Sequence, residues 1–411
     1  MKLIEGGICA SAGFVANGVH CGIRHNTSKK DLALIVSEVP ASAAAVYTTN
    51  LVKGAPLEVT KQHLSNGIAQ AVICNSGNAN TCNANGIEIA NEMSELCASE
   101  LSAAGYKMSA EDIVVASTGV IGQPLSIDPI KGGLPSLVAG LSNERASATA
   151  AAEGIMTTDT IKKEIAVEFE INGTTCHLGG IAKGSGMIHP NMATMLVFLT
   201  SDVAITPEMI SVALKGDIAK TFNMLSVDGD TSTNDMVTIL ANGMAGNTLI
   251  DSQDEKFATF AAALNTVTVW LCRTIAADGE GATKLLECQV TGAATQDCAK
   301  TVAKSVITSS LTKAAMFGAD ANWGRVLCAI GYSGADVDVR KVDVSFKSAA
   351  GTIDVCKNGA GIPFSEEFAK QVLLEDEIDI LIELNSGSEQ ATAWGCDLTY
   401  EYVKINGDYR T

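Results

Sequence analysis

The residues best suited to chemistry lie between positions 183 and 199. A glycine-rich segment, Lys183-Gly-Ser-Gly-Met-Ile-His-Pro-Asn-Met-Ala-Thr194, runs into the apolar stretch Met195-Leu-Val-Phe-Leu199, which is typical of a buried strand. Thr194 therefore stands at the start of the predicted strand, directly after the small Ala193. A threonine hydroxyl needs a base to become a nucleophile, and cleavage of the Ala193–Thr194 bond would supply one, the α-amine of Thr194 itself. The residues would suit a chain that cleaves itself and acts through its new N-terminus, but on the pattern alone an ordinary loop entering a buried strand is the more common interpretation.

Acyl transfer by a hydroxyl passes through a tetrahedral oxyanion, which needs hydrogen-bond donors already in place. Such a donor is commonly worth about 3 to 4 kcal/mol. Ser117-Thr118-Gly119 follows the strand-like run Asp112-Ile-Val-Val-Ala116 and offers a threonine hydroxyl or amide and an unobstructed glycine amide. An ordinary turn at the end of a strand fits the same residues, and on the sequence alone this turn is the favoured interpretation.

The segment Lys183-Gly-Ser-Gly-Met-Ile-His-Pro-Asn-Met-Ala-Thr-Met-Leu196 resembles the processing segment of the ornithine acetyltransferase family of arginine biosynthesis, also called bifunctional glutamate N-acetyltransferases. Motifs from residue 14 to residue 411 agree with this resemblance. It implies autoproteolysis into an α chain of residues 1–193 and a β chain of residues 194–411, packed as one body. It also implies ping-pong transfer of acetyl from N2-acetyl-L-ornithine to L-glutamate through an acetyl-threonine at Thr194.

The resemblance further assigns residues to the site. Thr118 and Gly119 become the oxyanion hole, and the substrate contacts are Thr157, Lys183, Thr194, Glu280, Asn406 and Thr411. Thr158 is an alternative to Thr157 within Met156-Thr-Thr-Asp-Thr160. N-acetylornithine carries a carboxylate and a cationic amine, which Lys183 and Glu280 would match in charge. On the residues alone, both would be solvated loop charges, as most such residues are.

The surrounding sequence predicts the elements that would position these residues. Strand-like runs and helix-like spacings alternate before Thr194, and strand-like alternation is extensive in the last third. Strands are expected at 32–36, 43–47, 69–74, 112–116, 337–346, 377–383 and 402–411, a hairpin turn at Asn172-Gly173, and helices over 89–101, from Thr206-Pro207 onward, and over 257–264. The predicted class is α+β, a mixed multi-layer sheet-and-helix body with the threonine nucleophile at a strand start. The turn-rich segments Cys74–Asn80 and Asp228–Asp235 are expected near the site, without an assigned role.

Composition restricts the partners. The chain has 411 residues, 47% hydrophobic content and a formal net charge of −18, which argues against nucleic acid or an anionic membrane. Twelve cysteines lie no closer together than Cys74 and Cys82, which fits neither a zinc site nor a disulfide scaffold and indicates reduced thiols. No metal and no cofactor are expected, although acetyl-CoA is a candidate co-substrate. Without a leader-like or membrane-spanning apolar run, the expected location is the cytoplasm.

Two rival functions stay open. A self-made nucleophile that passes its acyl group to water would make the chain an N-terminal-nucleophile aminopeptidase or amidase. A non-catalytic binding or scaffold protein would use Thr194 only as a strand residue. The resemblance favours the acetyltransferase with small-molecule substrates, assembled as a heterotetramer of two α and two β chains.

Overall fold

Two mixed β-sheets organise the chain in the computed structural model, which describes residues 1–189 and 195–407. Ala193, Thr194 and Thr411 lie outside the described residues. Within these residues the larger sheet has nine strands in the order β1-β6-β7-β8-β9-β3-β4-β5, with β2 paired to β3. Its strands are β1 (Lys2–Ile4), β2 (Phe14–Val19), β3 (Leu32–Tyr47), β4 (Ile68–Asn78), β5 (Ile113–Val120), β6 (Lys163–Ile171), β7 (Thr174–Lys183), β8 (Leu196–Ser201) and β9 (Met236–Ala241).

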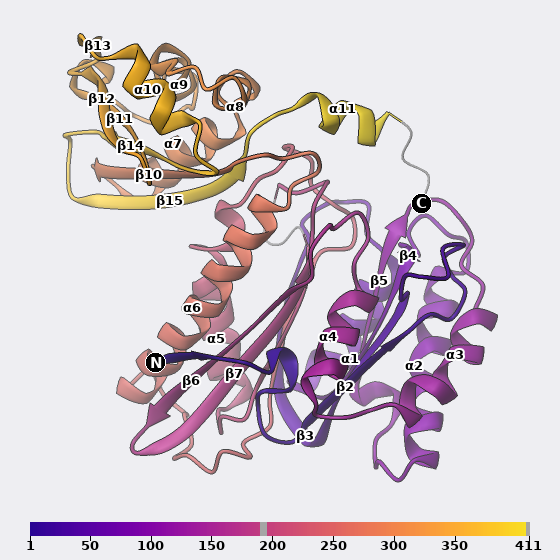
Figure 1. Cartoon of the computed structure of the whole chain (residues 1–411). Coiled ribbons are helices and arrows are strands. Elements are labelled where there is room, and N and C mark those ends of the chain that lie inside the picture. The colour runs from indigo at the N-terminus through magenta and orange to yellow at the C-terminus, as the bar shows by residue number, and fades with distance from the viewer. Residues whose placement is uncertain (190–194, 408–411) are drawn as a thin grey trace.

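The smaller sheet lies beyond one end of the larger one (Figure 1). Its order is β13-β12-β11-β14-β10-β15, with β10 parallel to β14 and antiparallel to β15. The strands are β10 (Leu285–Ala293), β11 (Asp343–Ser348), β12 (Gly351–Lys357), β13 (Ala360–Gly361), β14 (Glu377–Glu383) and β15 (Glu389–Cys396). The helices of the chain are α1 (Ala55–His63), α2 (Gly86–Ala103), α3 (Asp128–Ala139), α4 (Arg145–Gly154), α5 (Pro207–Ile218), α6 (Glu255–Ala277), α7 (Gln296–Thr308), α8 (Ser310–Phe317), α9 (Trp323–Gly331), α10 (Glu366–Leu373) and α11 (Tyr400–Asn406).

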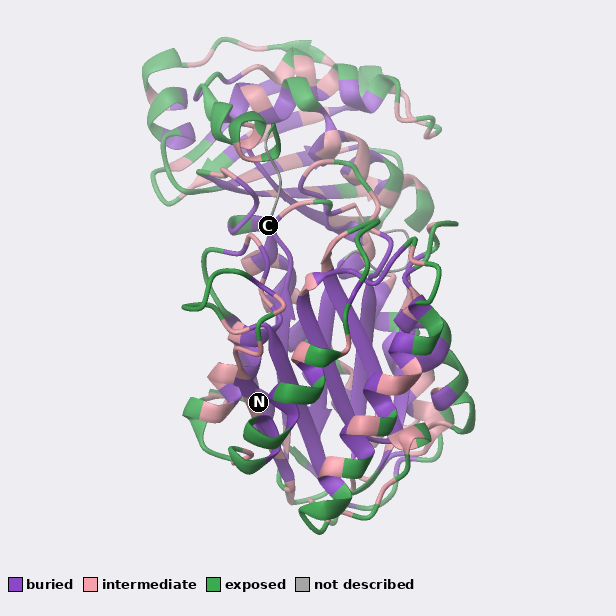
Figure 2. Cartoon of the chain, turned by 90° about the vertical axis from the view of Figure 1, so that its right-hand side faces the viewer, coloured by how far each residue is buried: buried purple, intermediate pink, exposed green. Residues whose placement is uncertain are grey.

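Helices cover both faces of the larger sheet. On β3, Leu34 packs with α2 and α3, while its neighbour Ile35 faces the opposite side with α4, because successive strand residues point to opposite faces. Helices α5 and α6 pack on the face formed by Val167, Leu178 and their neighbours. The strands are consequently buried, whereas the outer faces of the helices are exposed (Figure 2). The mixed sheet-and-helix class predicted from the sequence is confirmed.

Local signals predicted several elements correctly. Asn172 and Gly173 adopt φ of 50° and 80° and join β6 to β7, as a tight hairpin turn with two positive φ angles requires. Thr206 caps α5, since its side chain accepts a hydrogen bond from the Met209 amide, and Pro207 occupies the first helical position.

Other predicted bounds were wrong. The two strands expected at 32–36 and 43–47 form one strand, β3, whose register shifts between Val36 and Ala41; Pro40, which has no N–H to donate, lies in this interval. The strand expected from residue 337 begins only at Asp343. The Asp338 side chain accepts a hydrogen bond from the Arg340 amide and stabilises a short 3-10 helix there instead.

The C-terminal segment forms a helix rather than the expected strand. Helix α11 begins after Thr399. Glu401 in its first turn and Lys404 in its last turn interact favourably with the helix dipole and stabilise the helix. Thr399 Oγ1 also donates to the Gly281 carbonyl at 2.7 Å. The chain therefore leaves the smaller sheet and returns toward the larger one as a helix (Figure 1).

Among the described residues, one helix, α6, is long and apolar enough to cross a membrane by length and composition alone. Its face with Phe260, Leu264, Val267 and Leu271 is fully buried in the core of the protein. Helix α6 is therefore explained as a core helix that packs on β6 and β7.

Candidate active site

A cavity of about 300 Å³ lies where the ends of β5 and β7 meet the loop after α6 and helix α11. The residues around it come from segments spread over most of the chain. They are Ala79, Thr118, Gly119, Val120, Ile121, Thr157, Thr158, Lys183, Gly186, Met187, Ser232, Thr233, Asn234, Glu280 and Asn406. Every described residue that the sequence analysis assigned to the site lines this cavity. Because Thr157 and Thr158 both line it, the choice between them stays open.

Thr118 and Gly119 belong to β5 itself, and not to a turn that follows it. The parallel pairing with β4 continues through Ser76↔Thr118 and Gly77↔Gly119. Gly119 has a φ of +131°, and a Cβ there would lie 2.3 Å from the carbonyl carbon of Gly77. Only glycine fits this close backbone approach. The expected turn is wrong, but the strand holds both residues rigidly at the cavity.

Asn234 fixes the strand that carries Thr118. Its Nδ2 donates to the carbonyl oxygens of Ala79, at 2.5 Å, and Ser117, at 2.9 Å. Its Oδ1 accepts hydrogen bonds from the hydroxyls of Thr81 and Thr233. The loop before β9 is thereby tied to the ends of β4 and β5, so the turn-rich segment Asp228–Asp235 does lie at the site, as expected.

Glu280 is buried at the cavity, with 7% of its surface exposed, and is not a solvated loop charge. Its amide donates to the Ser185 carbonyl at 2.9 Å, and its Oε2 accepts a hydrogen bond from Asn406 Nδ2 at 2.7 Å. A Cβ on Gly186 would lie only 2.2 to 2.6 Å from the Glu280 carboxylate. Gly186 is therefore needed to let the carboxylate lie against this loop.

Lys183 is likewise buried, with 8% of its surface exposed. It is the last residue of β7, and its register partner on β8 is Leu196, two positions after Thr194. Nearby, burial raises the pKa of Asp235 well above its usual value, while a hydrogen bond from Ser232 and the charge of Lys183 oppose this shift. Lys183 thus lines the cavity while its backbone pairs with β8.

The segment before the predicted cleavage position is anchored by Asp228. Its carboxylate accepts the amides of Met187, at 2.6 Å, and Ile188, at 2.9 Å, and the Tyr402 hydroxyl of α11 at 3.2 Å. Beyond the undescribed residues, the Met236 amide of β9 donates to the Met195 carbonyl at 2.8 Å. The chain is therefore fixed on both sides of residues 190–194.

His189 stands at the end of the anchored segment. Its Nδ1 lies 3.0 Å from Ser226 Oγ, and its carbonyl accepts a hydrogen bond from Thr231 Oγ1 at 2.8 Å. Burial lowers the pKa of His189 to about 4, with a further contribution from Lys304, while the charge of Asp228 acts in the opposite direction. The imidazole is therefore neutral at neutral pH.

Acidification is expected to destabilise the protein through His189. An unfolded histidine has a pKa of about 6.5, so between this value and the folded value of about 4 the unfolded state binds more protons. Stability should therefore fall as the pH is lowered through this window. Calorimetric melting temperatures recorded across it should decline less steeply for His189→Gln than for the wild type. Equal slopes would contradict the assignment.

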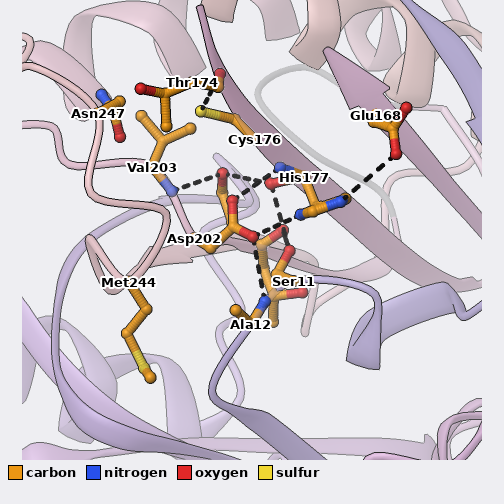
Figure 3. Close-up of polar contacts among 12 residues, drawn as sticks. Ser11, Ala12, Glu168, Thr174, Cys176, His177, Asp202, Val203, Met244 and Asn247 are labelled. Carbon is orange, nitrogen blue, oxygen red and sulfur yellow. Dashed lines mark hydrogen bonds and ion pairs between the residues drawn. The ribbon is translucent and has the colours of Figure 1, made fainter. Parts of the chain in front are cut away.

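A second polar cluster, at the far ends of β7 and β8, combines serine, histidine and aspartate without forming a nucleophile (Figure 3). His177 Nδ1 lies 2.7 Å from Asp202 Oδ2, and its Nε2 lies 3.8 Å from Glu168. The Ser11 hydroxyl donates to the backbone carbonyls of His177 and Thr200, and the imidazole is not its acceptor. This cluster ties the strand ends together. Over residues 1–189 and 195–407, no group of three His, Cys, Asp or Glu side chains could hold a metal ion.

Sequence reasoning missed the residues that act through packing. Asn234, Gly186 and Tyr402 were assigned no role, although Gly186 belongs to the glycine-rich segment and Asn234 to a segment expected near the site. Their contacts join positions 94 or more residues apart, such as Tyr402 with Asp228, so no local pattern could have identified them.

This cavity gathers hydroxyl, amide, ammonium and carboxylate groups from separate segments around one space, as the active site of an enzyme does. The sequence matches the ArgJ family over residues 15–411. The chain therefore belongs to the ArgJ family, the ornithine acetyltransferase family of arginine biosynthesis that it resembles.

Individual relatives agree over the full length. The chain is 49% identical over 412 residues to the arginine biosynthesis bifunctional protein ArgJ of Caldanaerobacter subterraneus subsp. tengcongensis, with 100% of both chains covered. It is 50% identical over 413 residues to the protein of the same name from Symbiobacterium thermophilum, again with 100% of both covered. A solved structure of ornithine acetyltransferase complexed with ornithine, from Mycobacterium tuberculosis, is 38% identical, with a TM-score of 0.44, over 47% of this chain and 99% of that one.

Proposed function

We propose that this enzyme transfers acetyl from N2-acetyl-L-ornithine to L-glutamate through an acetyl-threonine at Thr194, formed after autoproteolysis of the Ala193–Thr194 bond. The observation that carries this proposal is the cavity itself. It gathers Thr118, Lys183 and Glu280 beside the pairing of β7 with β8. Thr194 itself lies outside the described residues; Leu196, the first residue of β8, is the register partner of Lys183.

In the first half-reaction, Thr194 Oγ attacks the acetyl carbonyl while the α-amine of Thr194 accepts the hydroxyl proton. Donors from Thr118 and Gly119 stabilise the oxyanion. The C–N bond of the donor breaks, the leaving amine takes the proton, and ornithine departs. In the second half-reaction the neutral amine of glutamate attacks the acetyl ester and the acyl C–O bond to Thr194 Oγ breaks. The proton lost by the attacking amine passes through the α-amine of Thr194 to Oγ, which restores the hydroxyl and releases N-acetylglutamate.

Charge supports this choice of substrates. Acetylornithine carries a side-chain ammonium and an α-carboxylate, and the cavity offers the Glu280 carboxylate and the Lys183 ammonium. Both groups are largely withdrawn from water, which strengthens their interaction with a bound charge. Ornithine and glutamate share the α-amino acid head, so one cavity can serve both half-reactions. The reaction needs no cofactor, and acetyl-CoA is a second donor to be tested.

The topology supports cleavage into pieces that stay packed. The larger sheet contains strands that precede position 194 in sequence and strands that follow it. Two of them, β7 before this position and β8 after it, pair directly with each other. An α chain of residues 1–193 and a β chain of residues 194–411 would therefore share one sheet. Two such pairs, located in the cytoplasm, complete the proposal.

Acetyl transfer and cleavage can be tested on one preparation. The purified protein should give two fragments on a denaturing gel, with a new N-terminal sequence beginning at Thr194. It should turn over acetylornithine only when glutamate is present, with N-acetylglutamate as the product. Equal consumption of acetylornithine without glutamate would favour the amidase instead. An uncleaved chain that still transfers acetyl would contradict the mechanism.

Replacement of Glu280 tests the charge assignment. Glu280→Gln keeps the shape and removes the negative charge, so the KM for acetylornithine should rise by about tenfold or more, as expected for loss of a buried charge pair. The KM for glutamate, whose side chain is anionic, should change much less. Steady-state kinetics with each substrate varied separately measure both values. An equal rise in the two KM values would show that Glu280 does not bind the donor ammonium.

A further inference from the structure

A cluster of buried charged side chains, Asp159, Lys163 and Asp278, lies next to residues of the cavity but does not line it. Lys163, the first residue of β6, has a fully buried side chain. Its Nζ donates to Asp159 Oδ1 at 2.7 Å and to Asp278 Oδ2 at 2.5 Å. A lysine is almost never fully buried unless it is paired, and here the two closest partners are carboxylates, with the Ile161 carbonyl as a third acceptor at 3.4 Å.

The carboxylate of Asp159 holds two segments that carry cavity residues. Oδ2 accepts the amide of Thr157 at 2.9 Å, and Oδ1 accepts the amide of Gly184, the neighbour of Lys183, at 2.7 Å. Burial alone would raise the pKa of Asp159, but the charges of Lys163 and Lys183 and the hydrogen bond from Gly184 lower it below its usual range. Asp159 is therefore ionised, and it links the Thr157 loop to the end of β7.

Asp278 links the third segment, the loop after α6 that carries Glu280, to the other two. It accepts the amide of Thr160 at 3.1 Å, while its own backbone carbonyl accepts the Ser185 hydroxyl at 2.8 Å. Glu280 follows two positions later and donates its amide to the Ser185 carbonyl. The segments that carry Thr157, Lys183 and Glu280 are therefore linked through Asp159 and Asp278 to one lysine, which is separated from Asp278 by 115 positions in sequence.

We propose that Lys163 is a positioning residue. It fixes the three segments that carry Thr157, Lys183 and Glu280 relative to one another, so that these side chains can contact one small amino acid together. The identity of that amino acid rests on the proposed function. Lys163 touches no substrate, and its effect should therefore appear in substrate binding and not in the reactivity of Thr194.

Lys163→Met tests this role. We expect a rise of at least tenfold in the KM for both acetylornithine and glutamate, with kcat within about threefold of wild type, since contacts made equally in the ground and transition states are lost. Acetylation of Thr194 by p-nitrophenyl acetate, which has no amino acid head, should stay within about threefold. The matched control is Lys284→Met, because Lys284 is also buried but its Nζ donates to the carbonyls of Met316 and Leu373, which do not line the cavity.

Removing only the lysine leaves two buried carboxylates without their cation, which can prevent folding. The neutral variant Asp159→Asn/Lys163→Met/Asp278→Asn removes all three charges and should fold, with the same rise in KM. Amide hydrogen exchange gives a readout that needs no substrate: Thr157, Gly184 and Glu280 should exchange faster in a folded Lys163 variant than in Lys284→Met.

Unchanged KM values and unchanged exchange in a folded Lys163 variant would overturn the inference. A wild-type protein that transfers no acetyl would instead contradict the proposed function. In that case the exchange comparison alone would decide the role of Lys163, with faster exchange supporting it and equal exchange overturning it.

Discussion

Thr194→Ala is expected to give a single uncleaved chain of 411 residues that transfers no measurable acetyl. The substitution removes the hydroxyl that attacks the Ala193 carbonyl, and without cleavage the α-amine that acts as base is never released. Loss of a nucleophile commonly lowers kcat by about 10⁴-fold to 10⁶-fold. Intact-mass spectrometry and the acetylornithine–glutamate assay on the same sample measure both effects.

Thr194→Ser is the matched control, because serine keeps both the hydroxyl and the adjacent amine. It should still cleave and still transfer acetyl, although more slowly. Circular dichroism should give the same folded spectrum for both variants, since each substitution changes only one small side chain. Two fragments from Thr194→Ala, or retained transfer, would exclude Thr194 as the nucleophile.

The sequence predicted those parts of the molecule that depend on local chemistry. The hairpin at Asn172-Gly173 and the start of α5 at Thr206-Pro207 follow from backbone preferences that do not need the rest of the fold. Most of the candidate site was predicted through family resemblance: six of the assigned positions line the cavity, whereas Thr194 and Thr411 lie outside the described residues.

The remainder depends on contacts between distant segments, which no local pattern encodes. Helix α11 was predicted as a strand, although Glu401 and Lys404 favour a helix locally; what the sequence does not show is its docking, by Tyr402 on Asp228 and by Asn406 on Glu280. Lys163 appears in the sequence as one charged residue before an alternating strand. Only the fold brings it between Asp159 and Asp278.

Thr118→Val is expected to lower kcat by about 10²-fold to 10³-fold, the usual cost of losing one oxyanion donor. Valine has nearly the shape of threonine, and Thr118 is buried within β5, so the strand pairing with β4 should survive and the KM values should change little. Thr118→Ser, which keeps the hydroxyl, should stay within about tenfold of wild type. Steady-state kinetics of acetyl transfer measure the difference.

Self-cleavage gives an independent readout of the same substitution, because attack on the Ala193 carbonyl would also form an oxyanion. Uncleaved chain should therefore accumulate in Thr118→Val and mature slowly on incubation, which gel densitometry over time would follow. Normal cleavage together with a normal kcat in Thr118→Val would mean that the threonine hydroxyl is not the oxyanion donor. The oxyanion would then have to be stabilised by the backbone amides of Thr118 and Gly119, which the rigid approach of Gly119 to Gly77 holds in place.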